Sequence, residues 1–239
     1  PYTVAVNLAA IAWVLIGLLC MASLLRTYSI APVWIAVTLF AFTFGTNLFY
    51  YAVIAPGMSH AYSFGLCSAF LWVGRRVLQQ AERKHMLLLG LLLGIIVLIR
   101  PVNGIILFAL PILADRELHW RTLISLMKAH LPALVGAAVL FVCVVSLQLV
   151  YYQIATGSPF VYSYGDEGFR WADPHMLDIL FSYRKGLFVY TPLLLLSMAG
   201  WPFLRRFSIT AAWAWVAFFI LLTYVLSSWW NWWYGGSFG

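Results

Sequence analysis

The stretch MLLLGLLLGIIVLIRPVNGIILFALPIL, residues 86–113, decides the fold, because two architectures are compatible with it. It is either one kinked helix or a pair of short helices that reverse at Arg100-Pro101. Proline lacks a backbone N–H and disfavours helical geometry in the residue before it, so we expect a break at this pair. The apolar part Met86–Ile99 would be about 21 Å long as a helix, so it crosses a membrane only if the residues before it continue the helix.

The composition around this stretch is that of an integral membrane protein. Hydrophobic residues make up 64% of the 239 residues and charged residues 9%, whereas soluble domains carry roughly 25% charged residues. Aromatic residues reach 18%, with 12 Trp, which is typical of the belts at membrane–water interfaces. The net charge of +7 is explained by cations that flank membrane spans, and a nucleic-acid partner is not expected.

The apolar runs predict one domain over residues 1–239, an all-α transmembrane bundle of about eight spans with short helices or loops at its outer face. The runs are Thr3–Leu25, Pro32–Val53, Ala61–Gly74, Met86–Ile99, Val102–Leu113, Leu131–Tyr152, Leu187–Leu204 and Ile209–Trp230. Residues 114–130 mix cations with Leu, Ile and Met, as does an amphipathic helix lying on a membrane surface. The chain starts at Pro rather than Met and stops after an aromatic cluster, so we expect it to be incomplete at both ends.

The distribution of cations favours the reversal at Arg100-Pro101. With the reversal, ten Lys and Arg side chains lie on one side of the membrane and four on the other. Without it, the split is eight against five and Arg100 is stranded within the membrane. Because cations concentrate on the cytoplasmic side, the reversal puts His60, Arg100, the polar loop at 154–186 and the C-terminal Trp cluster on the non-cytoplasmic face. The Trp cluster consists of Trp229, Trp230, Trp232 and Trp233. The four outer cations are Arg100, Arg170, Arg184 and Lys185.

The longest polar interruption runs from Tyr151 to Tyr190, with the loop at 154–186 as its centre. It holds four of the seven acidic residues of the chain. Unpaired backbone groups cost several kcal/mol each in hydrocarbon, so this segment must stand at a membrane surface or line a wet cavity. We interpret it as the floor or lid of a site, and we expect Asp173 to cap a short helix that begins at Pro174.

Arg100 is the first candidate for substrate binding. Its guanidinium is always charged, is costly beside an apolar run, and can hold a phosphate with two hydrogen bonds. The alternative is an interfacial arginine that reaches lipid headgroups. His60 could bind an anion, ligate a metal or shuttle a proton, or it is a polar cap. Arg184 and Lys185 are either headgroup anchors or part of the same phosphate-binding surface as Arg100.

Asp166 and Glu167, set between two glycines, are the candidates for catalysis. Adjacent carboxylates in a flexible loop could bind a divalent metal ion or act as a base, and the alternative is a solvated turn. The chain contains no Walker loop, GxGxxG, HExxH or GxSxG motif, so nucleotide hydrolysis, dehydrogenase chemistry and zinc proteolysis are not supported. The three cysteines form no CxxC pair, and neither a disulfide nor a metal site is expected from them.

Three groups of residues carry a family resemblance. Leu88–Pro101 is a glycine-spaced apolar run that ends in Arg-Pro. Three short stretches of the polar segment, TGSPF at 156–160, YGDEGF at 164–169 and GLFVYTP at 186–192, form the second group, and Trp232–Gly239, ending in GGSFG, forms the third. Together they resemble the membrane-embedded GT-C glycosyltransferases, in particular bacterial members similar to protein O-mannosyltransferases and aminoarabinose transferases.

The resemblance implies an all-helical enzyme of the bacterial inner membrane that transfers a sugar from a polyprenyl-phosphate donor on the outer face. Arg100, together with His60, would then face the donor phosphate. The family's catalytic carboxylate lies in the first outer loop, whereas the first outer acid of this chain is Asp166. Two further hypotheses therefore stay open: a non-catalytic membrane subunit that retains this scaffold in a larger complex, and a lipid carrier or transporter without transfer chemistry.

Overall fold

The computed structural model describes residues 2–116, 119–162, 165 and 167–233. Within these residues the fold is all-helical, as predicted, and its one β contact is an isolated bridge between Phe169 and Trp229. The elements in chain order are α1 (Tyr2–Arg26), α2 (Pro32–Phe44), η1 (Tyr50–Ile54), α3 (His60–Gln79), α4 (Arg83–Ile99), η2 (Pro101–Leu113), α5 (Trp120–Ala129), α6 (Leu131–Thr156), α7 (Met176–Phe181), α8 (Leu187–Tyr190), α9 (Leu193–Ala199), α10 (Trp201–Phe207) and α11 (Ile209–Ser227).

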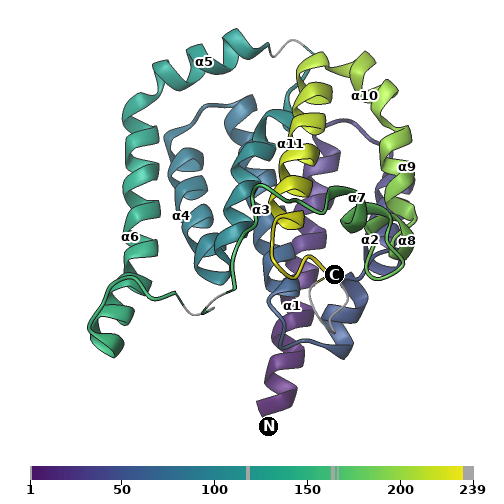
Figure 1. The fold of residues 1–239 in the computed structure, drawn as a ribbon. Helices are drawn as coiled ribbons and strands as arrows, with labels where there is room; N and C mark the ends of the chain where they lie inside the picture. The colour runs from purple at the N-terminus through teal and green to yellow at the C-terminus, as the bar shows by residue number, and fades with distance from the viewer. Residues whose placement is uncertain (1, 117–118, 163–164, 166, 234–239) are drawn as a thin grey trace.

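Three of the described helices, α1, α6 and α11, are long and apolar enough to cross a membrane. Their axes are roughly aligned with those of α3 and α4, some parallel and some antiparallel, and α5 crosses one end of this bundle on the way to α6 (Figure 1). We call this end the α5 end. The opposite end, where α4 meets η2 at Arg100-Pro101, is called the reversal end.

The chain does reverse at Arg100-Pro101. Near the start of η2, Asn103 Nδ2 donates to Ser63 Oγ at 2.8 Å, close to the start of α3. At the other end of η2, the Leu113 carbonyl accepts from Arg75 at 3.0 Å, close to the end of α3. Element η2 therefore runs parallel to α3, whereas α4 follows α3 through a tight turn and runs back along it. The two halves of the 86–113 stretch are antiparallel neighbours, and the prediction of a hairpin is confirmed.

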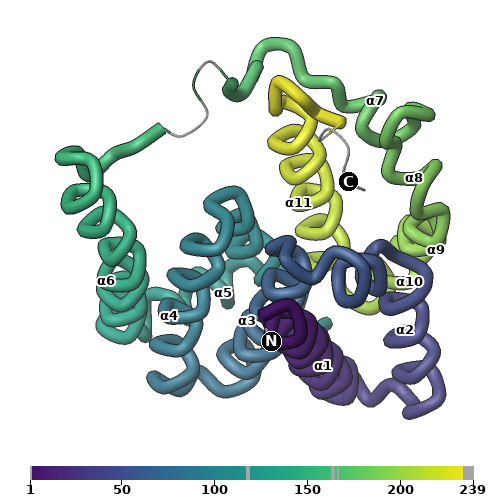
Figure 2. The backbone as a smooth tube through the Cα atoms, turned by 90° about the horizontal axis from the view of Figure 1, so that it is seen from below, coloured from purple at the N-terminus to yellow at the C-terminus, as the bar shows by residue number. Residues whose placement is uncertain are grey.

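Helix α6 is attached to the bundle through a close approach to α4. At Gly90 an added Cβ would lie 2.1 Å from the carbonyl oxygen of Ala137. One turn further, a Cβ at Gly94 would lie 2.8 Å from Cβ of Val144. Small residues four positions apart allow two membrane helices to approach backbone to backbone. The glycine spacing noted in the sequence is therefore the seam on which α6 packs, and Figure 2 shows α6 beside α4 and apart from α11.

Two predicted spans are interrupted. Helix α2 ends at Phe44, where Gly45 donates its N–H to the Ala41 carbonyl at 2.8 Å, and the chain turns before the π-helix η1. The predicted span Pro32–Val53 is therefore not one helix. The span predicted over Leu187–Leu204 divides into α8, α9 and α10, because Pro192 and Pro202 each remove a helical N–H and clash with the preceding turn.

The short helix of the polar segment begins later than predicted. Its first residue is Met176, and its N-cap residue is His175 rather than Asp173. Asp173 instead donates its N–H to the Arg170 carbonyl at 3.1 Å, which holds it in a turn ahead of the helix. Asp178, in the first turn of α7, is hydrogen-bonded to Nδ1 of His175 at 2.9 Å. The prediction of an Asp173 cap is wrong for this reason.

Candidate functional site

Four polar side chains gather where α3, α4 and η2 meet at the reversal end. His60 opens α3, and Arg100 lies between α4 and η2. Ser63 and Asn103, each three residues further along, are hydrogen-bonded to each other, and the Asn103 N–H donates to the Arg100 carbonyl at 2.9 Å. We call these four residues the Arg100 group. Because all four carry hydrogen-bond donors, the group offers the chemistry that an anionic ligand requires.

His60 is held in place by an aromatic partner. Its ring stacks on the buried ring of Tyr51, with centroids 3.9 Å apart and an interplanar angle of 27°. Burial first, and the positive charge of Arg100 second, lower the pKa of His60 below its ordinary value. At neutral pH His60 is therefore uncharged and can share an anion with Arg100 without repelling it. The structure brings these two predicted residues together, and their role in binding stays a prediction.

The lowered pKa of His60 makes stability depend on pH. Because the folded chain resists protonation of His60 more than the unfolded chain does, the free energy of unfolding should fall as the pH drops below the ordinary value of 6.5. We expect the melting temperature of the purified chain to fall over this range, and the fall to be smaller in His60→Phe, which keeps a ring against Tyr51. The exposed His119, replaced by Phe, is the control. An identical pH profile in wild type and His60→Phe would contradict the assignment.

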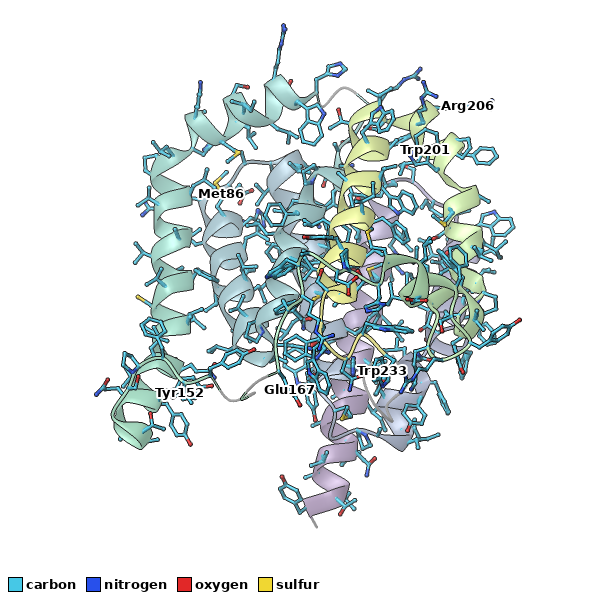
Figure 3. The ribbon with its side chains drawn as sticks, viewed as in Figure 1. Met86, Tyr152, Glu167, Trp201, Arg206 and Trp233 are labelled. Carbon is cyan, nitrogen blue, oxygen red and sulfur yellow. The ribbon has the colours of Figure 1, made fainter. Side chains whose placement is uncertain are left out.

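The polar segment is fixed to the end of α11 by backbone hydrogen bonds. The N–H of Arg170 donates to the Ser228 carbonyl at 2.6 Å, and that of His175 to the Ser227 carbonyl at 3.1 Å. In the reverse direction, the Trp230 N–H donates to the Gly168 carbonyl at 2.9 Å. Figure 3 shows Glu167 and Trp233 on the lower part of the molecule, away from Trp201 and Arg206 at the α5 end. The described residues 167–175 therefore have a defined position against the end of α11.

A depression of about 440 Å³ lies within this surface, lined by Glu167, Gly168, Phe169, Arg170 and Trp230. Two buried polar atoms, Nε1 of the lining residue Trp230 and Oδ1 of Asn231, which follows it in the sequence, have no hydrogen-bond partner among the described residues. Such atoms are almost always satisfied in folded proteins, so a polar ligand or water is expected beside them. A carboxylate, a guanidinium and an indole together suit a sugar, whose hydroxyls hydrogen-bond and whose ring faces pack on aromatics.

The remaining candidates lie apart from the Arg100 group or outside the described part of the chain. The guanidinium of Arg184 lies 3.7 Å from the ring centroid of Trp233, and Lys185 follows it as a half-buried residue. The described contacts contain no direct link between Arg184 and Arg100. Asp166 lies outside the described residues, as do part of the YGDEGF motif and all of the GGSFG motif. Among the described residues, no group of three or more His, Cys, Asp and Glu side chains could hold a metal ion.

A second polar group, at the α5 end, was missed by the sequence reasoning. The Arg75 side chain is only 3% exposed. Its Nε donates to Thr27 Oγ1 at 3.2 Å, Nη1 to the Leu113 carbonyl at 3.0 Å and Nη2 to Asp115 Oδ1 at 2.7 Å. The guanidinium also lies 4.3 Å from the ring centroid of Tyr28. Arg75 therefore joins the ends of α1, α3 and η2 in one network.

The groups around Arg75 satisfy one another. Burial raises the pKa of Tyr28 to about 12, so its hydroxyl stays protonated and donates to the Leu113 carbonyl at 2.9 Å. Ser208, the N-cap of α11, donates from Oγ to the Asp115 carbonyl at 3.2 Å. Because the donors of Arg75 face protein acceptors, this network holds helix ends together. The sequence does not show which of the neighbouring residues Arg75 and Arg76 is buried. Adjacent side chains on a helix point about 100° apart, so the two enter different surroundings.

Sequence reasoning also missed Ser63, Asn103 and Tyr51 at the reversal end. The signal for the first two was present: each follows a chosen residue by three positions, which places it on the same helical face. No comparable signal marked Tyr51, since its ring reaches His60 only after α2 has ended and the chain has turned.

Comparison of the chain with protein-family models, with curated proteins and with solved structures gives no match. The functional argument therefore rests on the residues described above.

Proposed function

We propose that this chain belongs to a membrane-integral glycosyltransferase of the GT-C type. It transfers a sugar from a polyprenyl-phosphate donor on the non-cytoplasmic face, crosses the bacterial inner membrane about eight times, and uses the reversal end as its active face. The observation that carries the proposal is the Arg100 group: a charged guanidinium and a neutral imidazole lie close together at the hairpin between two apolar helices.

The charge distribution supports this orientation. Cations cluster at the α5 end, and this concentration is typical of a cytoplasmic face. The reversal end then faces outward together with the polar segment. The cations of the α5 end are Arg26, Arg75, Arg76, Arg83, Lys84, Arg116, Arg121, Lys128, Arg205 and Arg206.

In this proposal Arg100 holds the donor phosphate. The guanidinium gives two parallel hydrogen bonds to phosphate oxygens, and each charge-assisted bond is worth about 1.5–3 kcal/mol. When the sugar leaves, negative charge grows on the phosphate, and a fixed cation stabilises that charge. His60, neutral at pH 7, donates a further hydrogen bond from a ring held by Tyr51. Asn103 and Ser63 fix the backbone turn that presents Arg100.

The depression around Glu167 is the proposed place for the reacting sugar or its acceptor. The Glu167 carboxylate could take the proton of an acceptor hydroxyl, and the alternative base is the neighbouring Asp166. The Arg170 guanidinium supplies hydrogen-bond donors, and the Trp230 ring supplies an aromatic surface. Arg184 and Lys185 are proposed as part of the same phosphate-binding face, approached from the Trp cluster.

Replacing Arg100 with alanine in the intact protein should reduce sugar transfer about 100-fold or more in kcat/KM, because two charge-assisted hydrogen bonds to the phosphate are lost. The measurement is turnover of a polyprenyl-phosphate sugar in proteoliposomes. The matched control is Arg206→Ala, an exposed cation of α10 at the opposite end, which should retain normal turnover. Unchanged turnover in Arg100→Ala, with normal folding, would refute the role given to Arg100.

One observation favours a second candidate, a non-catalytic subunit that keeps this scaffold within a larger membrane complex. The connection between α2 and α3, residues 45–59, contains neither Asp nor Glu, although the resemblance places the catalytic carboxylate in the first outer loop. The two candidate functions predict different results for the variant Glu167→Gln. Loss of transfer supports catalysis by this chain, whereas normal transfer by a complex containing Glu167→Gln supports the subunit.

A further inference from the structure

A large apolar cavity lies at the α5 end of the bundle, on the side away from the Arg100 group. Its volume is about 780 Å³, within the range of roughly 300–1,000 Å³ that is usual for small-molecule sites. The walls come from α3, α4, η2, α6 and α11, and α5 contributes a row of apolar side chains along one edge. Every described lining residue is apolar, with Phe70, Met86, Leu110 and Phe218 among the largest. A polar ligand would lose its hydration there without compensation, so the guest must be hydrocarbon.

The cavity exists because two facing helices carry small residues and do not pack on each other. Ala137 and Ala138 face it from α6, and Ala214 and Ala217 face it from α11. Helix α6 packs on α4 at Gly90 instead, and the cavity lies between α6, α11 and α5. Larger side chains at these alanine positions would have filled it.

The edge formed by α5 has the composition of a membrane–water interface. Its apolar face, which includes Leu123, Ile124 and Met127, lines the cavity. Arg121 and Lys128 are both exposed and lie seven residues apart, so they share one flank of the helix. Helix α5 contains no acidic residue. An amphipathic helix with cations on its polar flank lies in the headgroup region and attracts anionic lipids.

From this juxtaposition we infer that the cavity binds one acyl chain of an anionic phospholipid from the leaflet on the α5 side, with its headgroup held by Arg121 and Lys128. The apolar walls account for the chain, and the cationic flank accounts for the charge. The Arg100 group lies at the other end of α4, so this lipid is not the proposed sugar donor. The inference stands independently of the proposed function.

The test uses the full chain reconstituted in phosphatidylcholine vesicles. The vesicles contain a trace of a lipid with a photoreactive acyl chain, which is phosphatidylglycerol in one sample and phosphatidylcholine in the other. Cross-linked peptides are then identified by mass spectrometry. Phosphatidylglycerol should label cavity residues of α5, α6 and α11 more strongly than phosphatidylcholine does. In Arg121→Ala/Lys128→Ala this labelling should fall by roughly fivefold for each cation removed, about 30-fold in all, while labelling by phosphatidylcholine stays unchanged.

Two further variants separate the cavity from its surroundings. Arg205→Ala/Arg206→Ala removes two cations at the same end but away from the cavity lining, and phosphatidylglycerol labelling should persist. Ala138→Phe/Ala217→Phe narrows the cavity from α6 and from α11, and labelling of the cavity by either lipid should fall while labelling of the exposed face of α1 continues. Equal labelling by the two lipids, or persistence of phosphatidylglycerol labelling in Arg121→Ala/Lys128→Ala, would overturn the inference.

Discussion

Replacing Arg75 with methionine is expected to lower the free energy of unfolding by about 3 kcal/mol. Removing one partner of a buried ion pair costs about 3–5 kcal/mol. The Asp115 side chain is 47% exposed and can be solvated once its partner is gone, which puts the loss at the lower end of that range. Methionine keeps much of the length and apolar stem of arginine, so the change chiefly removes the hydrogen bonds to Thr27, Leu113 and Asp115.

The measurement is unfolding of the purified chain in detergent, followed by circular dichroism. Arg76→Met is the matched control, since Arg76 lies next in the sequence and its described interactions are weaker: its guanidinium lies 5.7 Å from the ring centroid of Trp72, and its charge acts on the exposed carboxylate of Glu82. Its loss should cost no more than about 1 kcal/mol. Equal destabilisation by the two variants would mean that the Arg75 network does not hold the helix ends together.

Replacing Gly90 with leucine should separate α6 from α4. A Cβ at this position would lie 2.1 Å from the Ala137 carbonyl oxygen and 2.6 Å from its carbon. These are backbone atoms, which cannot turn aside as a flexible side chain can, so the helices themselves must move. Overpacking costs typically 1–3 kcal/mol and more in severe cases, and we expect about 3 kcal/mol or more here. Alanine at position 90 should produce the same displacement to a smaller extent.

Distances between spin labels on α4 and α6 provide the measurement. In Gly90→Leu they should lengthen and broaden, and the melting temperature should fall. The control is Gly57→Leu, at a glycine where an added Cβ meets nothing within 4 Å. Unchanged label distances in Gly90→Leu would show that α6 is positioned by its connections rather than by the glycine seam.

The features predicted correctly are those set by strong local signals. The hairpin at Arg100-Pro101 followed from a proline that breaks a helix and from a count of cations on either side. Helices α1, α6 and α11 followed from apolar runs long enough to cross a bilayer. The proximity of His60 to Arg100 then followed from the hairpin, because both residues stand at the same end of neighbouring antiparallel segments.

The features that could not be predicted depend on whether a helix continues without a break and on contacts with residues that are distant in the sequence. Hydropathy shows that residues 187–204 are apolar on average, but breaks at Pro192 and Gly200 divide them into short helices without changing that average. The burial of Arg75 depends on Asp115, which is 40 residues away in the sequence. The cavity at the α5 end exists because α6 packs on α4 rather than on α11. Gly90 and Gly94 of α4 allow that close contact.

The geometry of η2 has a consequence for the length of the hairpin. It is a 3₁₀-helix of 13 residues, whereas runs of more than about four residues are uncommon. At about 2.0 Å per residue it reaches roughly 26 Å, compared with about 20 Å for the same residues as an α-helix. Stretched in this way, η2 spans as far as the 17 residues of α4, about 25 Å. Converting η2 to an α-helix would shorten it by about 6 Å. Arg100 and Leu113 could then not both keep their present positions.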